Sequence, residues 1–306
     1  MPTVEPPVCP VCGDTHQKQR YQITRFEVLE CEGCTQIYLY PLPSPEEIHT
    51  MFAELYTTGG GSLPELASYY GFCFDDEPSN PLVQVYESWL EKVEAIRKPG
   101  TILDVGCGTG LFLSVARRRG WTPYGIDASE EATAHARDHF DLDVWIQDFE
   151  DFTSDGKTFD VITGWDIIEH TRDPVAVLAA MRRCLAPGGI VALSTPNQRN
   201  ILDVVAGAFY HLSGGRMTAA LEKFYIEQHF LYFSPDTLSA ALGRADLEVV
   251  SLEPELTDLR RLTLNPLMRL VLMTLFTVSR WVGRENRILV MAGARGEERK
   301  IVSELA

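Results

Sequence analysis

The chain has 306 residues, and 45% of them are hydrophobic, which is enough for one large α/β domain and a small appendage without disulfide support. The formal net charge of −16 repels phosphate backbones, so we expect no nucleic-acid partner. The chain starts without the basic and apolar residues of a signal peptide, and its seven cysteines include two close pairs, which together favour a cytoplasmic location.

Two cysteine pairs lie near the start of the chain, and eighteen residues separate them. The four residues are Cys9, Cys12, Cys31 and Cys34. Four thiolates at this spacing predict a tetrahedral zinc site, closed and therefore structural, in a zinc-ribbon-like segment over residues 1–43. A redox role does not suit the context, because thioredoxin-like pairs lie beside a βαβ unit. The alternating run YQITRFEVLE, residues 21–30, predicts a strand between the pairs.

Residues 44–100 are expected to form a helical lid or linker. Ser44 suits a helix cap and Pro45 suits the first helical position, so one helix should begin there. A second helix is predicted from about residue 82 to residue 96.

Residues 101–195 alternate apolar runs with helical patterns. The apolar runs are TILDVG, WTPYGID, DVWIQD, FDVITGW and GIVALST, and helices are expected to begin near Gly110, Ser129 and Asp173. Strand, helix and strand at this spacing indicate parallel strands joined by crossover helices. Continuous apolar runs are typical of strands that are buried on both faces. We therefore predict an α/β fold with a parallel sheet.

Residues 196–306 are less regular. A helical excursion is expected at about 199–224, followed by a capped helix in SPDTLSAAL and strands in LEVVSLEP and RILVMAGA. Between these strands, a very apolar helix is expected at about 264–282, too short in its apolar stretch to span a bilayer. We expect it to pack on its own domain or on a second subunit, as in a homodimer. Peripheral membrane contact and a pocket for a lipid-like substrate are the alternatives.

The stretch TILDVGCGTGLF indicates the ligand. A P-loop needs Lys and then Ser or Thr after its last glycine, but Leu111 and Phe112 stand there. The dinucleotide fingerprint G-x-G-x-x-G does not fit the spacing of these glycines either. Asp104 beside the glycines disfavours a pyrophosphate and favours an ammonium group. The stretch therefore indicates a nucleoside that carries an amino acid, namely S-adenosylmethionine (SAM).

From this point the chain resembles a family, the class I SAM-dependent methyltransferases. LDVGCGTG is similar to their first motif, and GIDAS, IQDFED, FDVITGWDIIEH and LAPGGIVALSTPN resemble the later motifs, over roughly residues 80–255. The resemblance is greatest to small-molecule enzymes such as the ubiquinone-pathway O-methyltransferases. It implies a Rossmann-like sheet with helices on both faces over residues 101–306, and a substrate-cap insertion at about 197–230.

The resemblance also implies which residues bind SAM. Asp127 would accept hydrogen bonds from the ribose hydroxyls, and Asp148 would accept one from the adenine amino group. Trp165 and Ile167 would lie near the methionine part. The implied cofactor-binding set is Asp104, Gly106, Gly108, Gly110, Asp127, Ala128, Asp148, Phe149, Trp165 and Ile167.

Methyl transfer from a sulfonium depends first on positioning, since correct alignment supplies about 7–11 kcal/mol, whereas a general base adds about 10²–10⁴-fold in rate. His170 is the first candidate base, because it follows the fourth strand, and His229 is the second. Asp166, Glu169 and His170 are a candidate site for a second, divalent ion. Pairing of these acids with an arginine is the alternative.

We therefore expect a SAM-dependent methyltransferase that acts on a small-molecule acceptor, at the oxygen of a phenol or quinol, a sugar or a biosynthetic intermediate. C- or N-methylation of a nucleotide-linked sugar is the alternative within the enzyme class. Outside that class, a zinc-ribbon adaptor that binds SAM without turnover is the other interpretation.

Overall fold

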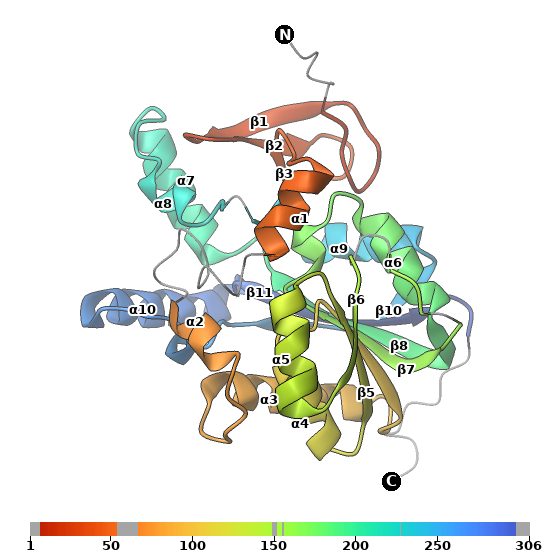
Figure 1. Cartoon of the computed structure of the whole chain (residues 1–306). Coiled ribbons are helices and arrows are strands. Elements are labelled where there is room, and N and C mark those ends of the chain that lie inside the picture. The colour runs from red at the N-terminus through yellow and green to blue at the C-terminus, as the bar shows by residue number, and fades with distance from the viewer. Residues whose placement is uncertain (1–6, 54–66, 149–151, 155, 227, 298–306) are drawn as a thin grey trace.

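The computed structural model describes residues 7–53, 67–148, 152–154, 156–226 and 228–297. A seven-stranded sheet forms its centre, in the order β10-β11-β8-β7-β4-β5-β6 (Figure 1). The strands are β4 (Thr101–Val105), β5 (Thr122–Asp127), β6 (Asp143–Ile146), β7 (Phe159–Trp165), β8 (Leu185–Pro196), β10 (Leu247–Glu255) and β11 (Arg287–Ala294). The strands β4 to β8 pair in parallel, whereas β11 is antiparallel to both of its neighbours.

Helices cover both faces of this sheet, as the sequence predicted. One face carries α3 (Pro81–Glu94), α4 (Leu111–Arg118) and α5 (Glu130–Phe140). The other face carries α6 (Pro174–Arg183) and α9 (Pro235–Arg244). Because β4, β7 and β8 are buried on both sides, their residues are almost continuously apolar.

The predicted helix starts are confirmed by the caps. The side chain of Ser129 accepts a hydrogen bond from the backbone N–H of Ala132, and Asp173 accepts one from Ala176. Gly110 precedes α4 with φ of 83°, a left-handed conformation that favours glycine.

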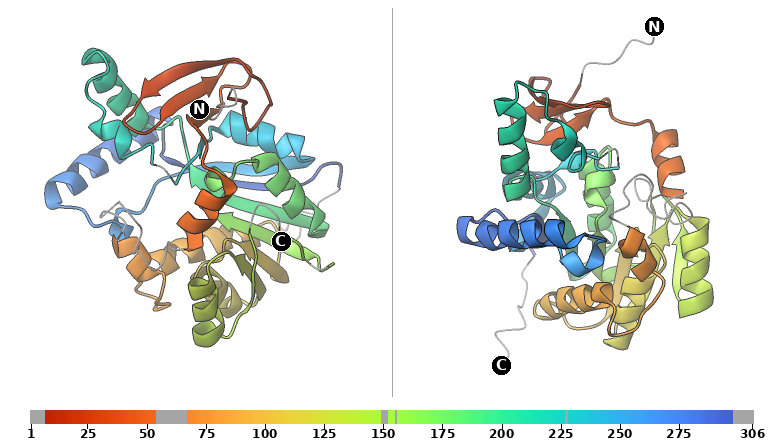
Figure 2. Two further views of the ribbon diagram at one scale, coloured as in Figure 1. Left: turned by 45° about the horizontal axis from the view of Figure 1, so that its top comes forward. Right: turned by 90° about the vertical axis from the view of Figure 1, so that its left-hand side faces the viewer.

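A second sheet of four strands, in the order β1-β2-β3-β9, packs above the first (Figure 2). Its strands are β1 (Gln17–Gln22), β2 (Glu27–Cys31), β3 (Ile37–Tyr40) and β9 (Leu231–Tyr232). The single strand predicted over residues 21–30 is wrong: the chain turns after Gln22, where the N–H of Ile23 donates to the carbonyl of Phe26. The turn lets β1 and β2 pair antiparallel, so each strand satisfies the backbone groups of the other.

The remaining helices lie around the two sheets. They are α1 (Pro45–Ala53), α2 (Ala67–Phe72), α7 (Ile201–Leu212), α8 (Ala219–Glu222) and α10 (Pro266–Val282), with short 3-10 turns at Ile168–His170 and Leu259–Arg261. The helical excursion predicted at 199–224 is two helices, because Gly214 and Gly215 have φ of 64° and 83° and interrupt it. Within the described residues, no helix has the length and apolarity that crossing a membrane requires.

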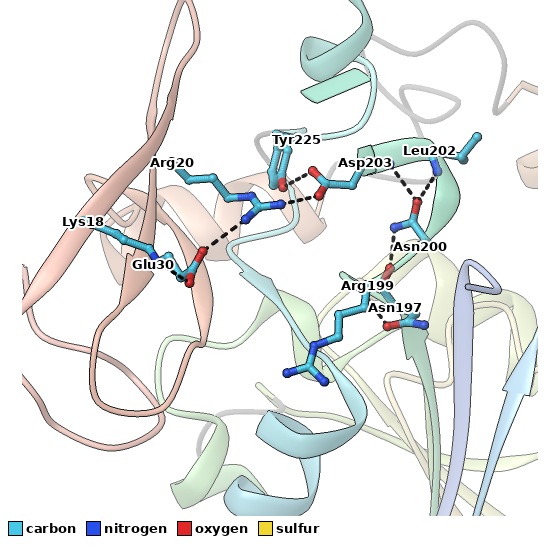
Figure 3. Close-up of polar contacts among 9 residues, drawn as sticks. All are labelled: Lys18, Arg20, Glu30, Asn197, Arg199, Asn200, Leu202, Asp203 and Tyr225. Carbon is cyan, nitrogen blue, oxygen red and sulfur yellow. Dashed lines mark hydrogen bonds and ion pairs between the residues drawn. The ribbon is translucent and has the colours of Figure 1, made fainter. Parts of the chain in front are cut away.

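The N-terminal strands are joined to β9 and α7. The β3 residues Ile37 and Tyr38 pair with β9, and Arg20 forms an ion pair with Asp203 of α7 at 2.6 Å. Figure 3 shows that Asp203 also accepts a hydrogen bond from the hydroxyl of Tyr225, at 2.8 Å. A shared apolar cluster lies beneath these contacts. It comprises Tyr21, Ile23, Val28, Ile37, Leu39, Ala206, Leu221, Tyr225 and Tyr232.

Candidate active site

The glycine-rich turn follows β4 at the centre of the sheet. Gly106, Gly108 and Gly110 have φ of 75°, 51° and 83°, so all three are in the left-handed region. A Cβ on Gly106 would lie 2.1 Å from Cδ1 of Ile167, so this position also lacks room for a side chain. The backbone N–H groups of Gly106 and Cys107 donate to the carbonyl of Ile126 and fix the turn against β5.

Asp127 is the last residue of β5 and closes the turn from the other side. Its carboxylate accepts hydrogen bonds from the backbone N–H of Gly108 at 2.8 Å and of Ser129 at 2.9 Å. Burial raises the pKa of Asp127, and the backbone N–H donors oppose that rise. The carboxylate lines the cavity next to the turn, where the hydroxyls of a ligand can reach it.

Asp104 is buried at the end of β4. The hydroxyl of Thr163 donates to its carboxylate at 2.6 Å. Burial raises the pKa of Asp104 to about 7, the bond from Thr163 opposes the rise and the charge of Asp127 adds to it. A cation that enters the cavity would therefore stabilise the charged form of Asp104.

A cavity of about 340 Å³ lies over the carboxyl ends of the central strands. The predicted site residues that line it are Asp104, Gly106, Asp127, Ala128, Trp165, Ile167, His170 and His229, and Asp166 lines it too. Gly108 and Gly110 shape the turn rather than the wall. Asp148 is exposed after β6 and is not among the described lining residues, and Phe149 lies outside the described residues.

Aromatic side chains form one wall of the cavity. Trp165 stacks on Trp89 with ring centroids 4.4 Å apart and meets Phe112 edge to face at 5.1 Å. The indole Nε1 of Trp165 is buried and has no hydrogen-bond partner among the described residues. A wall of this kind can present π surface to a cation in the cavity.

The two candidate bases lie together. The ring centroids of His170 and His229 are 4.8 Å apart, although the two residues lie far apart in the sequence. Nδ1 of His170 contacts the carbonyl oxygen of Gln228. Because a carbonyl only accepts, Nδ1 carries the proton and Nε2 keeps a free lone pair. Burial lowers the pKa of His170. Burial, together with the neighbouring His170, lowers the pKa of His229 to about 3. Both rings are therefore neutral at pH 7.

The acids beside these rings have different partners. Asp166 forms an ion pair with Arg287 at 2.6 Å; burial opposes its charge, but Arg287 and Arg261 lower its pKa. Glu169 accepts a hydrogen bond from Thr195 with one oxygen, while its Oε1 is buried without a partner among the described residues. Burial and the charge of Asp166 raise the pKa of Glu169 to about 8. The ligand atoms of Glu169, His170 and His229 lie within 4.8 Å of one another. His229 thus takes the place that the sequence suggested for Asp166.

The four N-terminal cysteines also come together. Sγ of Cys9 lies 3.6 Å from Sγ of Cys34, and Sγ of Cys12 lies 3.5 Å from Sγ of Cys31. All four sulfur atoms lie within 4.8 Å of one another, and none forms a disulfide. Zn–S bonds of 2.3 Å in a tetrahedron place sulfur atoms about 3.8 Å apart. The cluster therefore fits a tetrahedral metal ion.

Two buried arginines in the cavity were not predicted from the sequence. Arg287 is the first residue of the last strand, and Arg261 follows another arginine in the run DLRRLT. Both look like ordinary surface charges in their local sequence. Only the folded chain places Arg287 against Asp166 and Arg261 against the ring of Tyr69.

A central sheet with a glycine-rich turn after its first strand and an acid at the end of its second defines the Rossmann-like, nucleoside-binding class of α/β proteins. A family model described as a methyltransferase domain matches residues 82–252. The chain belongs to this family and is a SAM-dependent methyltransferase.

Known relatives agree with this assignment. The ubiquinone biosynthesis O-methyltransferase of Pseudomonas paraeruginosa is 35% identical over 202 residues, which cover 63% of this chain and 80% of the relative. The protein of that name from Hahella chejuensis is 33% identical over 177 residues, which cover 55% and 68%. Magnesium protoporphyrin IX methyltransferase from Synechocystis, solved with bound SAH, has a TM-score of 0.51 at 14% identity over 80% of this chain and 98% of that one, and this likeness shows the fold alone.

Proposed function

We propose that this methyltransferase transfers the methyl group of SAM to an oxygen of a small-molecule acceptor. The proposal depends on one observation about His170. This residue is neutral, its Nε2 has a free lone pair, and it lines the same cavity as the glycine turn. The names of the relatives, which are O-methyltransferases, support oxygen as the acceptor atom. A phenol or quinol is the acceptor class that we favour, ahead of a sugar or another biosynthetic intermediate.

In the proposed complex the ammonium group of SAM faces Asp104 and its ribose hydroxyls face Asp127. SAM supplies a methyl group that is already activated. Trp165 and Ile167 hold the methionine end, and the chain aligns the acceptor oxygen with that methyl group. His170 removes the proton of the acceptor hydroxyl at Nε2 while Gln228 keeps Nδ1 protonated.

The experiment is conversion of SAM to SAH with catechol-type acceptors and with cell extract. We expect His170→Ala to lower turnover by about 10²–10⁴-fold and to leave SAM affinity close to that of wild type. His211→Ala is a matched control, because His211 lies at the end of α7 outside the cavity-lining set. Full activity in His170→Ala would remove His170 as the base. C- or N-methyl products would favour the nucleotide-linked sugar alternative, and no conversion with any extract would favour the non-catalytic adaptor.

We further propose a structural zinc ion at the four cysteines, within a ribbon over residues 1–43 that precedes a helical segment over 44–100 and the SAM-binding domain over 101–306. The sulfur spacing supports the zinc site. A divalent ion at Glu169, His170 and His229 is the alternative to His170 as the base, because it would use the same Nε2 of His170 as a ligand; the orphaned Oε1 of Glu169 supports it. Chelation also removes the proposed ribbon zinc, so the informative result is activity that survives it, which would leave His170 free to act as the base.

A further inference from the structure

Arg261 is a buried charge in the wall of the cavity. Arg261 is only 6% exposed to solvent, and it lines the cavity together with Trp165, Asp166 and His229. Its guanidinium lies over the ring of Tyr69, with Cζ 5.0 Å from the ring centroid. A guanidinium stays charged at every physiological pH, so burial here requires compensation.

The described residues do not supply that compensation. The Nε atom of Arg261 is buried without a hydrogen-bond partner, and no carboxylate among the described residues forms an ion pair with this guanidinium. The two acids in its vicinity are already paired: Asp258 with Arg260 at 2.5 Å, and Asp166 with Arg287 at 2.6 Å. Stacking on Tyr69 uses the face of the guanidinium and leaves its edge, where the N–H donors are, available to a ligand.

We propose that Arg261 forms a carboxylate-binding subsite of the cavity, an inference that rests on the proposed function. A planar guanidinium edge matches a carboxylate through two parallel N–H···O bonds. The subsite lies beside the Asp166–His229 side of the cavity, and Arg261 lies beyond residues 82–252 that the family model matches. Two carboxylates have the required chemistry: that of the amino-acid end of SAM and one carried by the acceptor.

Two pairs of probes distinguish these sources by calorimetry, without any need for turnover. The first pair is SAM and decarboxylated SAM, which differ only in the carboxylate. The second pair is 3,4-dihydroxybenzoate and catechol, bound to the protein loaded with SAH. The Arg261→Gln variant should lose roughly 10- to 100-fold in affinity for the carboxylate-bearing member of one pair and bind its carboxylate-free partner as wild type does. A loss confined to the first pair assigns the subsite to the cofactor, and a loss confined to the second assigns it to the acceptor.

Control variants keep the result interpretable. Arg280→Gln removes an exposed arginine of α10 and should bind all four probes as wild type does. Arg261→Lys retains the charge but not the planar fork, so it should recover only part of the lost affinity. Equal losses of affinity for both members of each pair would indicate a purely structural role of Arg261 and would overturn the proposal. A wild-type protein that binds neither carboxylate-bearing probe more tightly than its carboxylate-free partner would overturn it too. Failure of methyl transfer with SAM still bound would count against the proposed function alone.

Discussion

Asp127 has two roles to reconcile. Its carboxylate holds the glycine turn through Gly108 and Ser129, and we propose that it also accepts the ribose hydroxyls of SAM. A carboxylate has about four lone-pair positions, so two backbone donors leave room for a ligand. The pre-formed contact to the turn then orients the oxygen atoms before SAM arrives.

Replacing this carboxylate tests the assignment. Asp127→Ala should weaken SAM binding by roughly 10- to 150-fold, because hydrogen bonds to a charged group contribute about 1.5–3 kcal/mol. Calorimetry measures the affinity, and Asp143→Ala, an exposed acid at the start of β6, is the matched control. Unchanged affinity in Asp127→Ala would contradict the ribose assignment.

If the ammonium group of SAM faces Asp104, as we propose, SAM binding should depend on pH. Its pKa in the unliganded protein is about 7, so the carboxyl group is mostly protonated below that pH. The ammonium group of SAM favours the charged form, so SAM affinity should rise from about pH 6 to pH 8, by up to about tenfold per unit below the pKa. In Asp104→Asn the affinity should be lower and nearly independent of pH over this range. A wild-type affinity that falls with rising pH would show that the ammonium does not face Asp104.

The same raised pKa affects stability with the opposite sign. A carboxyl group that binds its proton more tightly in the folded state stabilises the unliganded fold at low pH, and this contribution is lost as the pH rises through about 7. Bound SAM offsets the loss, since it stabilises only the folded state.

The residues of the site differ in how far sequence reveals them. Asp104, Asp127 and His170 lie in motifs where the residue type, the preceding strand and the spacing all indicate a ligand. Arg261 has no such signal, because burial of an arginine is decided by distant elements. The partner of Asp166 was likewise hidden, since Arg287 is 121 positions away and reaches it only through the antiparallel pairing of β11 with β8.

At the scale of elements, α10 combines an apolar sequence with an exposed surface. Only Phe276 and Ser279 are buried, whereas Leu267 is 72% exposed and Trp281 is 85% exposed. The helix contacts α7, and Figure 2 shows that it extends away from the main sheet. The expectation that it packs on its own domain therefore holds for one narrow side, and contact with a second subunit, a membrane or a lipid-like substrate stays a prediction.

Substitutions at two positions of α10 should therefore differ strongly in their effect on the free energy of unfolding. Phe276→Ala should lower the free energy of unfolding by about 3–5 kcal/mol, because it removes a buried aromatic ring and leaves a cavity. Leu267→Ala should change it by about 0.5 kcal/mol or less, because that side chain is already in water. Denaturant titration of the two variants measures both values. A large loss for Leu267→Ala in dilute protein would mean that a partner covers this helix in solution.

Element boundaries were predicted well where the caps are local and poorly where they depend on pairing. Ser129 and Asp173 cap their helices with their own side chains, so the sequence contains the whole signal. The hairpin of β1 and β2 was missed because both strands share one alternating pattern, and the turn between them contains neither glycine nor proline. The separation of α7 from α8 has a local signal, the Gly214–Gly215 pair, that was present in the sequence.

The N-terminal ribbon and the His170–His229 side of the cavity, where we propose that the acceptor binds, form one structure. The segment that carries Gln228 and His229 leads directly into β9, and β9 is the fourth strand of the ribbon sheet. The N–H of Leu39 donates to the carbonyl of Phe230, and the N–H of Phe230 donates to the carbonyl of Glu169. A continuous set of backbone bonds thus joins the ribbon to the residues around the proposed base.

This connection predicts what loss of the proposed zinc ion would do. Without zinc, a ribbon with little core of its own loses much of its folding energy, and β9 then loses its partner strand. Chelation, or Cys31→Ser combined with Cys34→Ser, should therefore lower turnover strongly while SAM affinity falls by less than about threefold, a difference of about 0.6 kcal/mol. The asymmetry arises because the glycine turn, Asp104 and Asp127 belong to the central sheet, and His170 and His229 depend on the contact with β9.

Three measurements on one preparation test this prediction: the metal content, the SAM affinity, and the turnover with an acceptor that the wild-type protein methylates. Cys184→Ser, a buried cysteine outside the cluster, controls for the loss of a thiol. About one zinc per wild-type chain and none in the double variant would support the ribbon site. If SAM affinity and turnover fell together, the ribbon would stabilise the whole fold rather than the acceptor side. If neither changed after the metal was lost, the strand pairing of β3 with β9 would persist without zinc, and the cysteines would have no structural role in the active site.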